Sequence, residues 1–322
     1  MFKSIRAIVA CTAVAVCFGA AAQEFPSRPV KVIVPYAPGG VVDVVTRSVT
    51  DKLAALWQQP VVVEPKPGAN GYIGADAVKN APADGYTLLT GAQFVVVSPV
   101  IDPNTRFRHT DFTPVAMIGA PPNVFVVPAS LPVKTLKDFV AYAKARPGKL
   151  NTAQMGIGGS NHLGMETFMQ MTGIDVVNVG YKGAPPMIPD LVSGQLHIVL
   201  APLSVALPSL QAGKIRALAV NATTRISSLP DVPTLVEAGF PAEAVVMPWF
   251  GLMAPKGTPP AVVERINISV NQALADPVVQ QRLKTLDTIV TPMSAAGFAK
   301  LVADENVRWI KLARQRNITA AN

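Results

Sequence analysis

Cysteine is nearly absent from this sequence. The 322 residues contain two, Cys11 and Cys17, and both lie in an N-terminal segment with the pattern of a secretory signal peptide. Two basic residues precede an apolar stretch over residues 7–20, and small residues then lead to Ala22. We expect cleavage after Ala22. The exported chain would then contain no cysteine, which excludes disulfides, thiol catalysis and cysteine metal sites.

Long apolar runs, clustered charge and aromatic residues are also scarce. Beyond the N-terminal segment, Pro, Gly or charge interrupts every apolar run before the roughly 20 residues that a membrane helix needs. The exported chain has 26 basic and 20 acidic residues, all scattered, and aromatic residues make up 6% of the sequence. We therefore expect no nucleic-acid partner, while the basic excess favours anionic ligands at long range. The three histidines show no metal-ligand spacing.

The most informative stretch is Tyr36-Ala37-Pro38-Gly39-Gly40-Val41-Val42-Asp43. The apolar run before it, 30–35, predicts a buried strand, and the spacing after it predicts a helix over 44–57. Gly39 and Gly40 permit positive φ and close approach of the backbone. Such a turn presents N–H groups that attract an anion, although the same turn also occurs in α/β units that bind nothing. We expect Asp43 to hold the turn, and it can pair with Arg47.

The rest of the chain alternates strand and helix patterns, which predicts an α/β fold in two lobes. A strand at 87–90 ends before Gln93, which is either a pocket residue at the end of that strand or a solvated loop glutamine. A capping box at Thr135 predicts a helix to Arg146. Further strands are predicted at 61–64, 112–118, 124–127, 176–179, 198–200, 214–220 and 249–253, and three C-terminal helices at Thr258, Asp276 and Ser294. The strand at 249–253 is expected to return to the first lobe.

A second glycine-rich loop, Gly156-Ile157-Gly158-Gly159-Ser160-Asn161-His162, precedes another helix pattern. It lacks the Lys-Ser/Thr of a P-loop and the G-x-G-x-x-G spacing, so we expect no nucleotide and no other cofactor. Ser160 and His162 would suit a hydrolase only with a G-x-S-x-G elbow and a third partner, which the sequence does not offer. We favour a structural role at the helix start for His162. Lys182 is either a partner for a ligand carboxylate or a solvated loop lysine.

Several short motifs follow one another along essentially the whole exported chain. They are Pro-Tyr-Ala-Pro-Gly-Gly (35–40), Lys-Pro-Gly-Ala-Asn-Gly-Tyr-Ile-Gly-Ala-Asp (66–76), Asp-Gly-Tyr-Thr-Leu-Leu (84–89), Gly158 with Ser160 and His162-Leu163, Tyr-Lys-Gly (181–183), Gly-Lys-Ile-Arg-Ala-Leu-Ala-Val (213–220), Val-Pro-Thr (232–234) and Trp-Phe-Gly-Leu (249–252). In this order they resemble the periplasmic substrate-binding receptors of tripartite tricarboxylate transport systems, the Bug or TctC type.

The resemblance implies a two-lobed, type II periplasmic-binding-protein fold, or Venus flytrap. One domain would comprise 23–120 plus 247–322, and the other 121–246. The protein would be a periplasmic, monomeric receptor without enzymatic activity that holds a small carboxylate through backbone amides and ordered water and delivers it to membrane permease subunits. The ligand-binding residues that the resemblance implies are Tyr36, Pro38, Gly39, Gly40, Asp43, Gln93, Gly158, Gly159, Ser160, Asn161, His162, Tyr181 and Ala201.

Several positions depart from the family pattern. Gln154 and Gly159 stand where hydroxyl residues are usual, Ala184 where a second glycine is usual, and Ala201-Pro202 where a polar or acidic residue is common. We therefore expect a less polar distal pocket, suited to an aromatic or simple aliphatic carboxylate as well as to other acids. Two alternatives stay open: a receptor that presents a carboxylate to a membrane sensor kinase, and a periplasmic hydrolase that uses Ser160 and His162.

Overall fold

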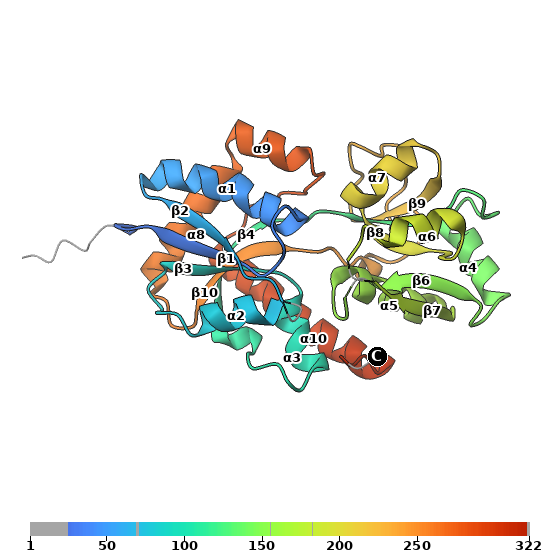
Figure 1. Ribbon diagram of the computed structural model, residues 1–322, viewed down its shortest axis with the longest axis horizontal. Helices are drawn as coiled ribbons and strands as arrows, with labels where there is room; N and C mark the ends of the chain where they lie inside the picture. The colour runs from blue at the N-terminus through green and yellow to red at the C-terminus, as the bar shows by residue number, and fades with distance from the viewer. Residues whose placement is uncertain (1–24, 69–70, 155, 182, 321–322) are drawn as a thin grey trace, which may run out of the picture.

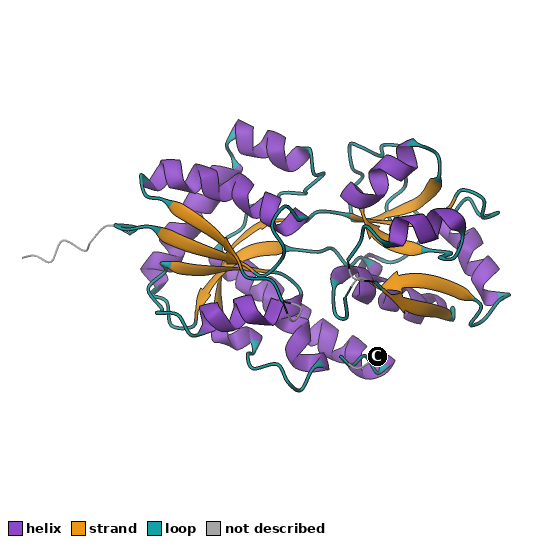
Figure 2. Ribbon diagram, viewed as in Figure 1, coloured by secondary structure: helices purple, strands orange, loops and turns teal. Residues whose placement is uncertain are grey.

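The structure is a computed structural model that describes residues 25–68, 71–154, 156–181 and 183–320. The expected signal segment, residues 1–22, lies outside the described residues. Two lobes lie side by side, each with helices packed against sheet (Figure 1). The helices and strands alternate in both lobes (Figure 2). None of the described helices is both long and apolar enough to span a bilayer.

The first lobe is built on a five-stranded sheet in the order β2-β1-β3-β10-β4. Its strands are β1 (Val30–Val34), β2 (Val61–Pro65), β3 (Thr87–Gly91), β4 (Phe112–Gly119) and β10 (Phe250–Pro255). The first three are parallel, and β10 runs antiparallel to both β3 and β4. Its helices are α1 (Val41–Trp57), α2 (Tyr72–Lys79), α3 (Phe94–Ile101), α8 (Pro260–Leu274), α9 (Pro277–Lys284) and α10 (Ala295–Arg316). Helix α1 contacts α8 and α9, whereas α10 contacts α3 (Figure 1).

The second lobe contains a three-stranded sheet, β8-β5-β9, and a pair, β6-β7. The strands are β5 (Asn123–Pro128), β6 (Leu150–Gln154), β7 (Val176–Gly180), β8 (Val199–Pro202) and β9 (Ile215–Asn221). A single bridge from Thr152 to Ile198 joins the two sheets. The helices are α4 (Leu136–Lys144), α5 (Ser160–Thr172), α6 (Met187–Ser193) and α7 (Leu203–Gln211), and short 3₁₀ turns occur at His109–Asp111 in the first lobe and Ala242–Ala244 here.

The chain passes between the lobes twice, once between β4 and β5 and once between β9 and β10. At the first crossing, the Ala120 N–H donates to the carbonyl of Ile289 at 2.9 Å, and the Ile289 N–H donates back at 3.1 Å. The strand expected at 249–253 does return to the first sheet as β10, which confirms that prediction. The residues before β10 therefore form the second connection, and the polar contacts described below hold them in place.

Four elements are not predicted by the sequence patterns: α3, α6, α7 and β6. Helix α3 is apolar around most of its circumference and carries Pro99, so it shows no amphipathic period and reads as a break. Pro208 lies inside α7 in the same way. Helix α1 begins at Val41 rather than at residue 44, because the glycine turn before it is shorter than expected.

Gly251 in β10 has no room for a side chain. A Cβ there would lie 2.8 Å from the carbonyl oxygen of Ala116 on β4 and would collide with the ring of Phe298. We predict that Gly251→Ala lowers the free energy of unfolding by about 1–3 kcal/mol, as overpacked cores do. The matched control is Gly180→Ala in β7, where nothing lies within 4 Å of the added carbon. Urea denaturation of both variants checks this, and equal midpoints for the two would contradict it.

Candidate functional site

A cavity of about 200 Å³ lies between the lobes. Residues that follow β1, β3 and β6 reach it, as does the last residue of β8, and ligands of open α/β sheets bind at such carboxyl ends. The described residues of its wall are Tyr36, Val41, Val42, Ala92, Gln93, Phe94, Pro121, Pro122, Asn123, Gly156, Gly159, Ser160, Asn161, Pro202, Ser204, Pro248, Phe250 and Leu286. The cavity thus brings together five of the predicted site residues: Tyr36, Gln93, Gly159, Ser160 and Asn161.

The two glycine turns reach this cavity with the same backbone geometry, one from each lobe. Gly39 and Gly158 have φ of 78° and 79°. The next residues, Gly40 and Gly159, are the N-caps of α1 and α5, with φ of −70° and −71°. Only the first glycine of each pair therefore uses a positive φ, because an N-cap residue has an extended backbone. Neither N-cap supplies a side-chain acceptor to its helix.

Each turn is held by the side chain of the third helical residue. The Gly39 N–H donates to Oδ2 of Asp43 at 2.9 Å, and the Gly158 N–H donates to Nδ1 of His162 at 3.2 Å. The turn-holding role expected for Asp43 and the helix-start role expected for His162 both correspond to these hydrogen bonds. The first N–H groups of each helix have no intrahelical acceptor and are left for another partner.

Asp43 is buried but does not carry an isolated charge. Nε of Arg47 donates to its Oδ1 at 3.0 Å, which is the i, i+4 pair expected from the sequence. Burial raises the pKa of the Asp43 carboxyl, but the hydrogen bonds from Arg47 and Gly39 together outweigh burial and lower that pKa below its usual value.

His162 is also buried, and its surroundings favour the neutral imidazole. Burial lowers its pKa; the carboxylate of Glu166, 3.8 Å from Nε2, opposes this, and Arg316 adds to it. Arg316 on α10 donates to the other carboxylate oxygen of Glu166 at 2.7 Å and thereby joins the two lobes. Within the described part of the chain, no hydrogen bond joins His162 to Ser160, so the dyad of the hydrolase alternative is not formed.

The sequence analysis missed Asn123, which organises the polar side of the cavity. Its Nδ2 donates to Oγ of Ser160 at 3.3 Å, and its Oδ1 accepts from Nδ2 of Asn161 at 3.2 Å. Nδ2 of Asn161 also donates to the carbonyl of Leu200 on β8 at 2.9 Å. The one signal in the sequence is a polar residue directly before the apolar strand, after Pro121-Pro122. Three amide and hydroxyl side chains are thus fixed beside the start of α5.

Gln93 combines two roles, because it lies in the cavity wall and binds the second crossing segment. Its Nε2 donates to the carbonyl of Met247 at 2.7 Å, and its Oε1 accepts from the Trp249 N–H at 3.3 Å. It is buried, so the solvated alternative for this residue is wrong.

The remaining predicted site residues lie outside the described wall of the cavity. Pro38 is exposed. Gly39 and Gly40 form the turn before Val41, and Asp43 binds that turn from the first turn of α1. Gly158 packs against α3, since a Cβ on it would lie 2.6 Å from Cγ1 of Val97. Ala201 is buried in the core of the second lobe, next to Pro202 of the wall. Tyr181 donates to Oδ2 of Asp190 at 2.6 Å, and burial together with that carboxylate raises the pKa of Tyr181 to about 12. Lys182 lies outside the described residues.

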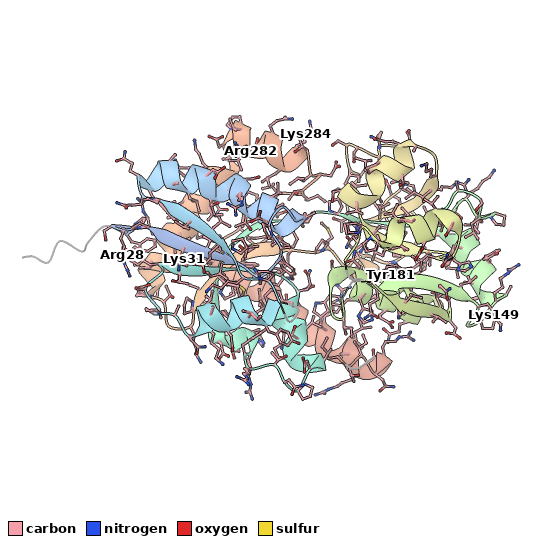
Figure 3. The ribbon with its side chains drawn as sticks, viewed as in Figure 1. Arg28, Lys31, Lys149, Tyr181, Arg282 and Lys284 are labelled. Atoms are coloured by element: carbon pink, nitrogen blue, oxygen red, sulfur yellow. The ribbon has the colours of Figure 1, made fainter. Side chains whose placement is uncertain are left out.

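None of the described residues in the cavity wall carries a formal charge. Of the basic side chains labelled in Figure 3, Arg28, Lys31 and Lys149 lie far from the gap between the lobes, whereas Lys284 lies beside it without reaching the described wall of the cavity. The described residues also contain no group of His, Cys, Asp and Glu suited to a metal ion. Four described helices, α1, α3, α5 and α7, begin at the cavity wall, and the N-terminal end of each helix dipole carries a partial positive charge.

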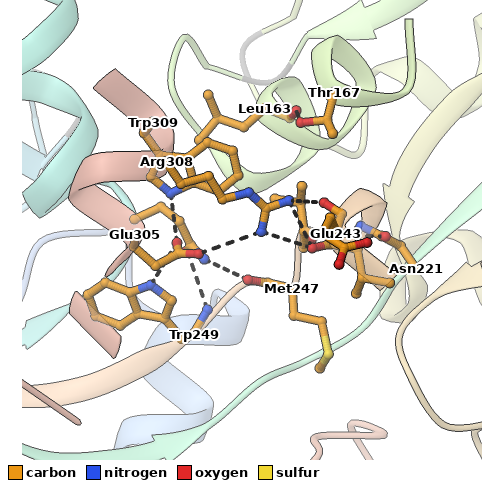
Figure 4. A network of polar contacts seen from close by, with 12 residues as sticks. Leu163, Thr167, Asn221, Glu243, Met247, Trp249, Glu305, Arg308 and Trp309 are labelled. Carbon is orange, nitrogen blue, oxygen red and sulfur yellow. Dashed lines mark hydrogen bonds and ion pairs between the residues drawn. The ribbon is translucent and has the colours of Figure 1, made fainter. Parts of the chain in front are cut away.

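Helix α10 also binds the second crossing segment (Figure 4). Arg308 donates to the carbonyls of Glu243 at 2.7 Å and of Val245 at 3.1 Å. The carboxylate of Glu305 accepts from the indole N–H groups of Trp309 at 2.7 Å and Trp249 at 3.3 Å. Burial raises the pKa of Glu305 in spite of these donors. The crossing segment is thus hydrogen-bonded both to Gln93 and to α10.

Comparisons with known proteins agree with this arrangement. A sequence model described as "Tripartite tricarboxylate transporter family receptor" matches residues 45–318. Protein BugT of Bordetella pertussis is 36% identical over 300 residues, which cover 91% of each chain.

Two solved structures are similar over almost the whole chain. Rpa4515 of R. palustris, solved with adipate, has a TM-score of 0.80 and 34% identity, and the match covers 92% of this chain and 99% of that one. MatC of Rhodopseudomonas palustris, solved with bound malate, has a TM-score of 0.76 and 33% identity, with 89% and 99% covered.

The burial of His162 predicts a pH dependence of stability. Because its pKa is lower in the folded chain than the roughly 6.5 of an unfolded one, the unfolded state takes up the proton first as the pH falls. This contribution to the free energy of unfolding is fully present above about pH 6.5 and is lost as the pH falls below it. Protonation at Nδ1 would also remove the acceptor for the Gly158 N–H.

We predict that His162→Gln, which keeps an acceptor but does not titrate, shows a smaller loss of stability between pH 7.5 and pH 5. Urea denaturation at the two pH values measures this loss in both proteins, and each protein at pH 7.5 is its own reference. An equal loss in the variant and the natural chain would show that His162 does not contribute.

Proposed function

Because this chain belongs to the tripartite tricarboxylate transporter receptor family, we propose that it binds a small carboxylate in the cavity between its lobes and delivers it to membrane permease subunits. The family consists of periplasmic receptors, and two similar structures hold adipate and malate. We place the ligand in the periplasm and retain cleavage after Ala22 as part of the proposal.

The observation that carries this proposal is the convergence of two uncapped helix N-termini on one cavity. The helices α1 and α5 come from opposite lobes. Each has a glycine N-cap, which has no side-chain acceptor that would occupy the first N–H groups of the helix. Backbone N–H groups at a helix start bind carboxylates well because they combine unpaired donors with the positive end of the helix dipole. A ligand held by both turns would also hold the lobes together.

We propose the domain boundaries 23–120 plus 247–322 and 121–246, since these place the glycine turns on separate bodies. The crossings near Ala120 and Met247 would then be the hinges. We assign Ser160 and Asn161 to contact with the ligand, together with Tyr36, Gln93 and Gly159. Their support is their place in the cavity wall and the hydrogen bonds that fix Ser160 and Asn161 to Asn123.

Gly159→Asp tests the role of the backbone donors. Asp is a favourable N-cap, so we expect unchanged or slightly higher thermal stability. Its carboxylate would occupy the N–H groups of α5 and repel an anion, and we predict that affinity falls roughly 10- to 100-fold, as expected for lost hydrogen bonds to a charged group. The measurement is isothermal titration with the tightest-binding acid from a panel of mono-, di- and tricarboxylates.

Two control variants separate the causes of such a loss. Gly159→Asn has nearly the same shape without the charge, and Gly180→Asp adds the charge at a strand position outside the cavity wall. We expect an intermediate loss for the first and little change for the second. If Gly159→Asp bound the acid as tightly as the natural protein, the helix start would not be the anion site.

A receptor binds its ligand without changing it. At a hundredfold excess over the dissociation constant, a ligand that binds only the folded protein should raise the free energy of unfolding by about 2.7 kcal/mol. We predict that the acid is recovered unaltered when the loaded protein is denatured and the supernatant is analysed by mass spectrometry. A hydrolysed or otherwise converted product would place the protein among enzymes.

A further inference from the structure

The direction of the hydrogen bonds around Asn161 is set by a backbone carbonyl. The carbonyl of Leu200 on β8 can only accept, so the atom of Asn161 that lies 2.9 Å from it must be the amide nitrogen. The same nitrogen donates to Oδ1 of Asn123 at 3.2 Å, which uses both of its hydrogens. Because the oxygen of Asn123 is thereby fixed as an acceptor, its Nδ2 is the atom that donates to Oγ of Ser160 at 3.3 Å. Each of the two amides therefore has only one orientation that satisfies its neighbours.

These bonds leave one donor and one acceptor free at the start of α5. The hydroxyl of Ser160 accepts from Asn123, so its own hydrogen is available to a carboxylate oxygen. Oδ1 of Asn161 accepts no hydrogen bond from the rest of the described chain. Solvent reaches this oxygen, since it is not one of the fully buried side-chain atoms without a partner in the described residues. Both residues belong to the wall of the cavity.

The other amide oxygens in the described wall are already occupied. Oδ1 of Asn123 accepts from Asn161, and Oε1 of Gln93 accepts from a backbone N–H of the second crossing segment at 3.3 Å. The hydroxyls of Tyr36 and Ser204 can donate as well as accept, so each can turn its hydrogen towards an anion. Oδ1 of Asn161 is therefore the side-chain atom of the described wall that can only accept and has no protein partner.

An acceptor of this kind is unfavourable beside a plain carboxylate. It would face the oxygens of the ligand and lose its water without gaining a donor. We propose that the ligand is a carboxylic acid that also carries a hydrogen-bond donor, a hydroxyl or an amino group, on a carbon close to the carboxylate, and that Asn161 selects for this donor. The inference rests on the proposed function, since it specifies which carboxylates occupy the same cavity. Ser160 and the first N–H groups of α5 would bind the carboxylate, while Oδ1 of Asn161 would accept from the neighbouring group.

The test compares acids that differ only in such a donor. Succinate is titrated beside malate and aspartate, and propionate beside lactate and alanine, with both enantiomers of each substituted acid. We expect isothermal titration to show that a hydroxy or amino acid of at least one series binds roughly 5- to 100-fold more tightly than its parent, as expected when a polar group would otherwise be buried without its partner. Each series also distinguishes the two donors, since malate and lactate carry a hydroxyl and aspartate and alanine an ammonium group.

The outcomes separate this inference from the proposed function. If the unsubstituted acid binds as tightly as its derivatives in every series that binds, the inference is overturned and the proposed function stays intact. If the tightest acid of the panel used for Gly159→Asp lies outside both series, its own 2-hydroxy and 2-amino derivatives are titrated beside it, and the same criterion applies. Binding of no acid at all would overturn both.

Two variants provide the second arm. Asn161→Ala removes the acceptor, and we expect the preference for the substituted acid over its parent to fall towards one. Ser160→Ala removes a donor to the carboxylate that both acids share, so we expect weaker binding of both and an unchanged preference. An unchanged preference in folded Asn161→Ala would contradict the inference. If that variant does not fold, the comparison of matched acids with the natural protein still decides.

Discussion

The structure depends on how two helices begin. Both α1 and α5 start at a glycine, although Ser, Asp or Asn at that position would stabilise each helix by a few tenths of a kcal/mol or more. The turn before each helix is held by a hydrogen bond that does not use the helix N–H groups. In one lobe the Gly39 N–H donates to Asp43, and in the other the Gly158 N–H donates to His162. The first N–H groups of each helix therefore stay available at the cavity. Two lobes with little sequence in common thus reach the same local solution, with φ values that agree within one degree.

Side-chain hydrogen bonds also constrain the second connection between the lobes. The segment before β10 is bound by Gln93 of the cavity wall and by α10, through Arg308 and Glu305 (Figure 4). The Glu166 to Arg316 pair adds a direct bond between α5 and α10. A change in the angle between the lobes would have to break or rearrange these hydrogen bonds. Because Gln93 belongs to both the cavity wall and this segment, a ligand that contacts its amide would also affect the connection between the lobes.

Local signals in the sequence were sufficient for the elements that have them. The glycine turn at 36–43 and the capping box at Thr135 each predict a helix start from a few neighbouring residues. The structure has α1 and α4 in those places. Helix α3 carries no such signal, because it is buried on most sides and lacks an amphipathic period. The roles of Gln93 and Asn123 could not be predicted in detail, because their partners lie 154 and 37 residues away in the sequence. Such contacts join segments far apart in the sequence, which no local pattern describes.

The charges around the cavity explain why backbone dipoles dominate its chemistry. The carboxylate of Asp43 would repel an anion bound at α1. The guanidinium of Arg47 lies 3.0 Å from that carboxylate and offsets its negative charge. At α5 the imidazole of His162 is neutral, and Glu166 is paired with Arg316 at 2.7 Å. Each turn is therefore supported by a layer whose formal charges sum to zero. What remains at the cavity is the partial charge of the first N–H groups of the helices, which is felt mainly within one helical turn. A carboxylate bound there would be held by backbone N–H groups rather than by a formally charged side chain of the described wall.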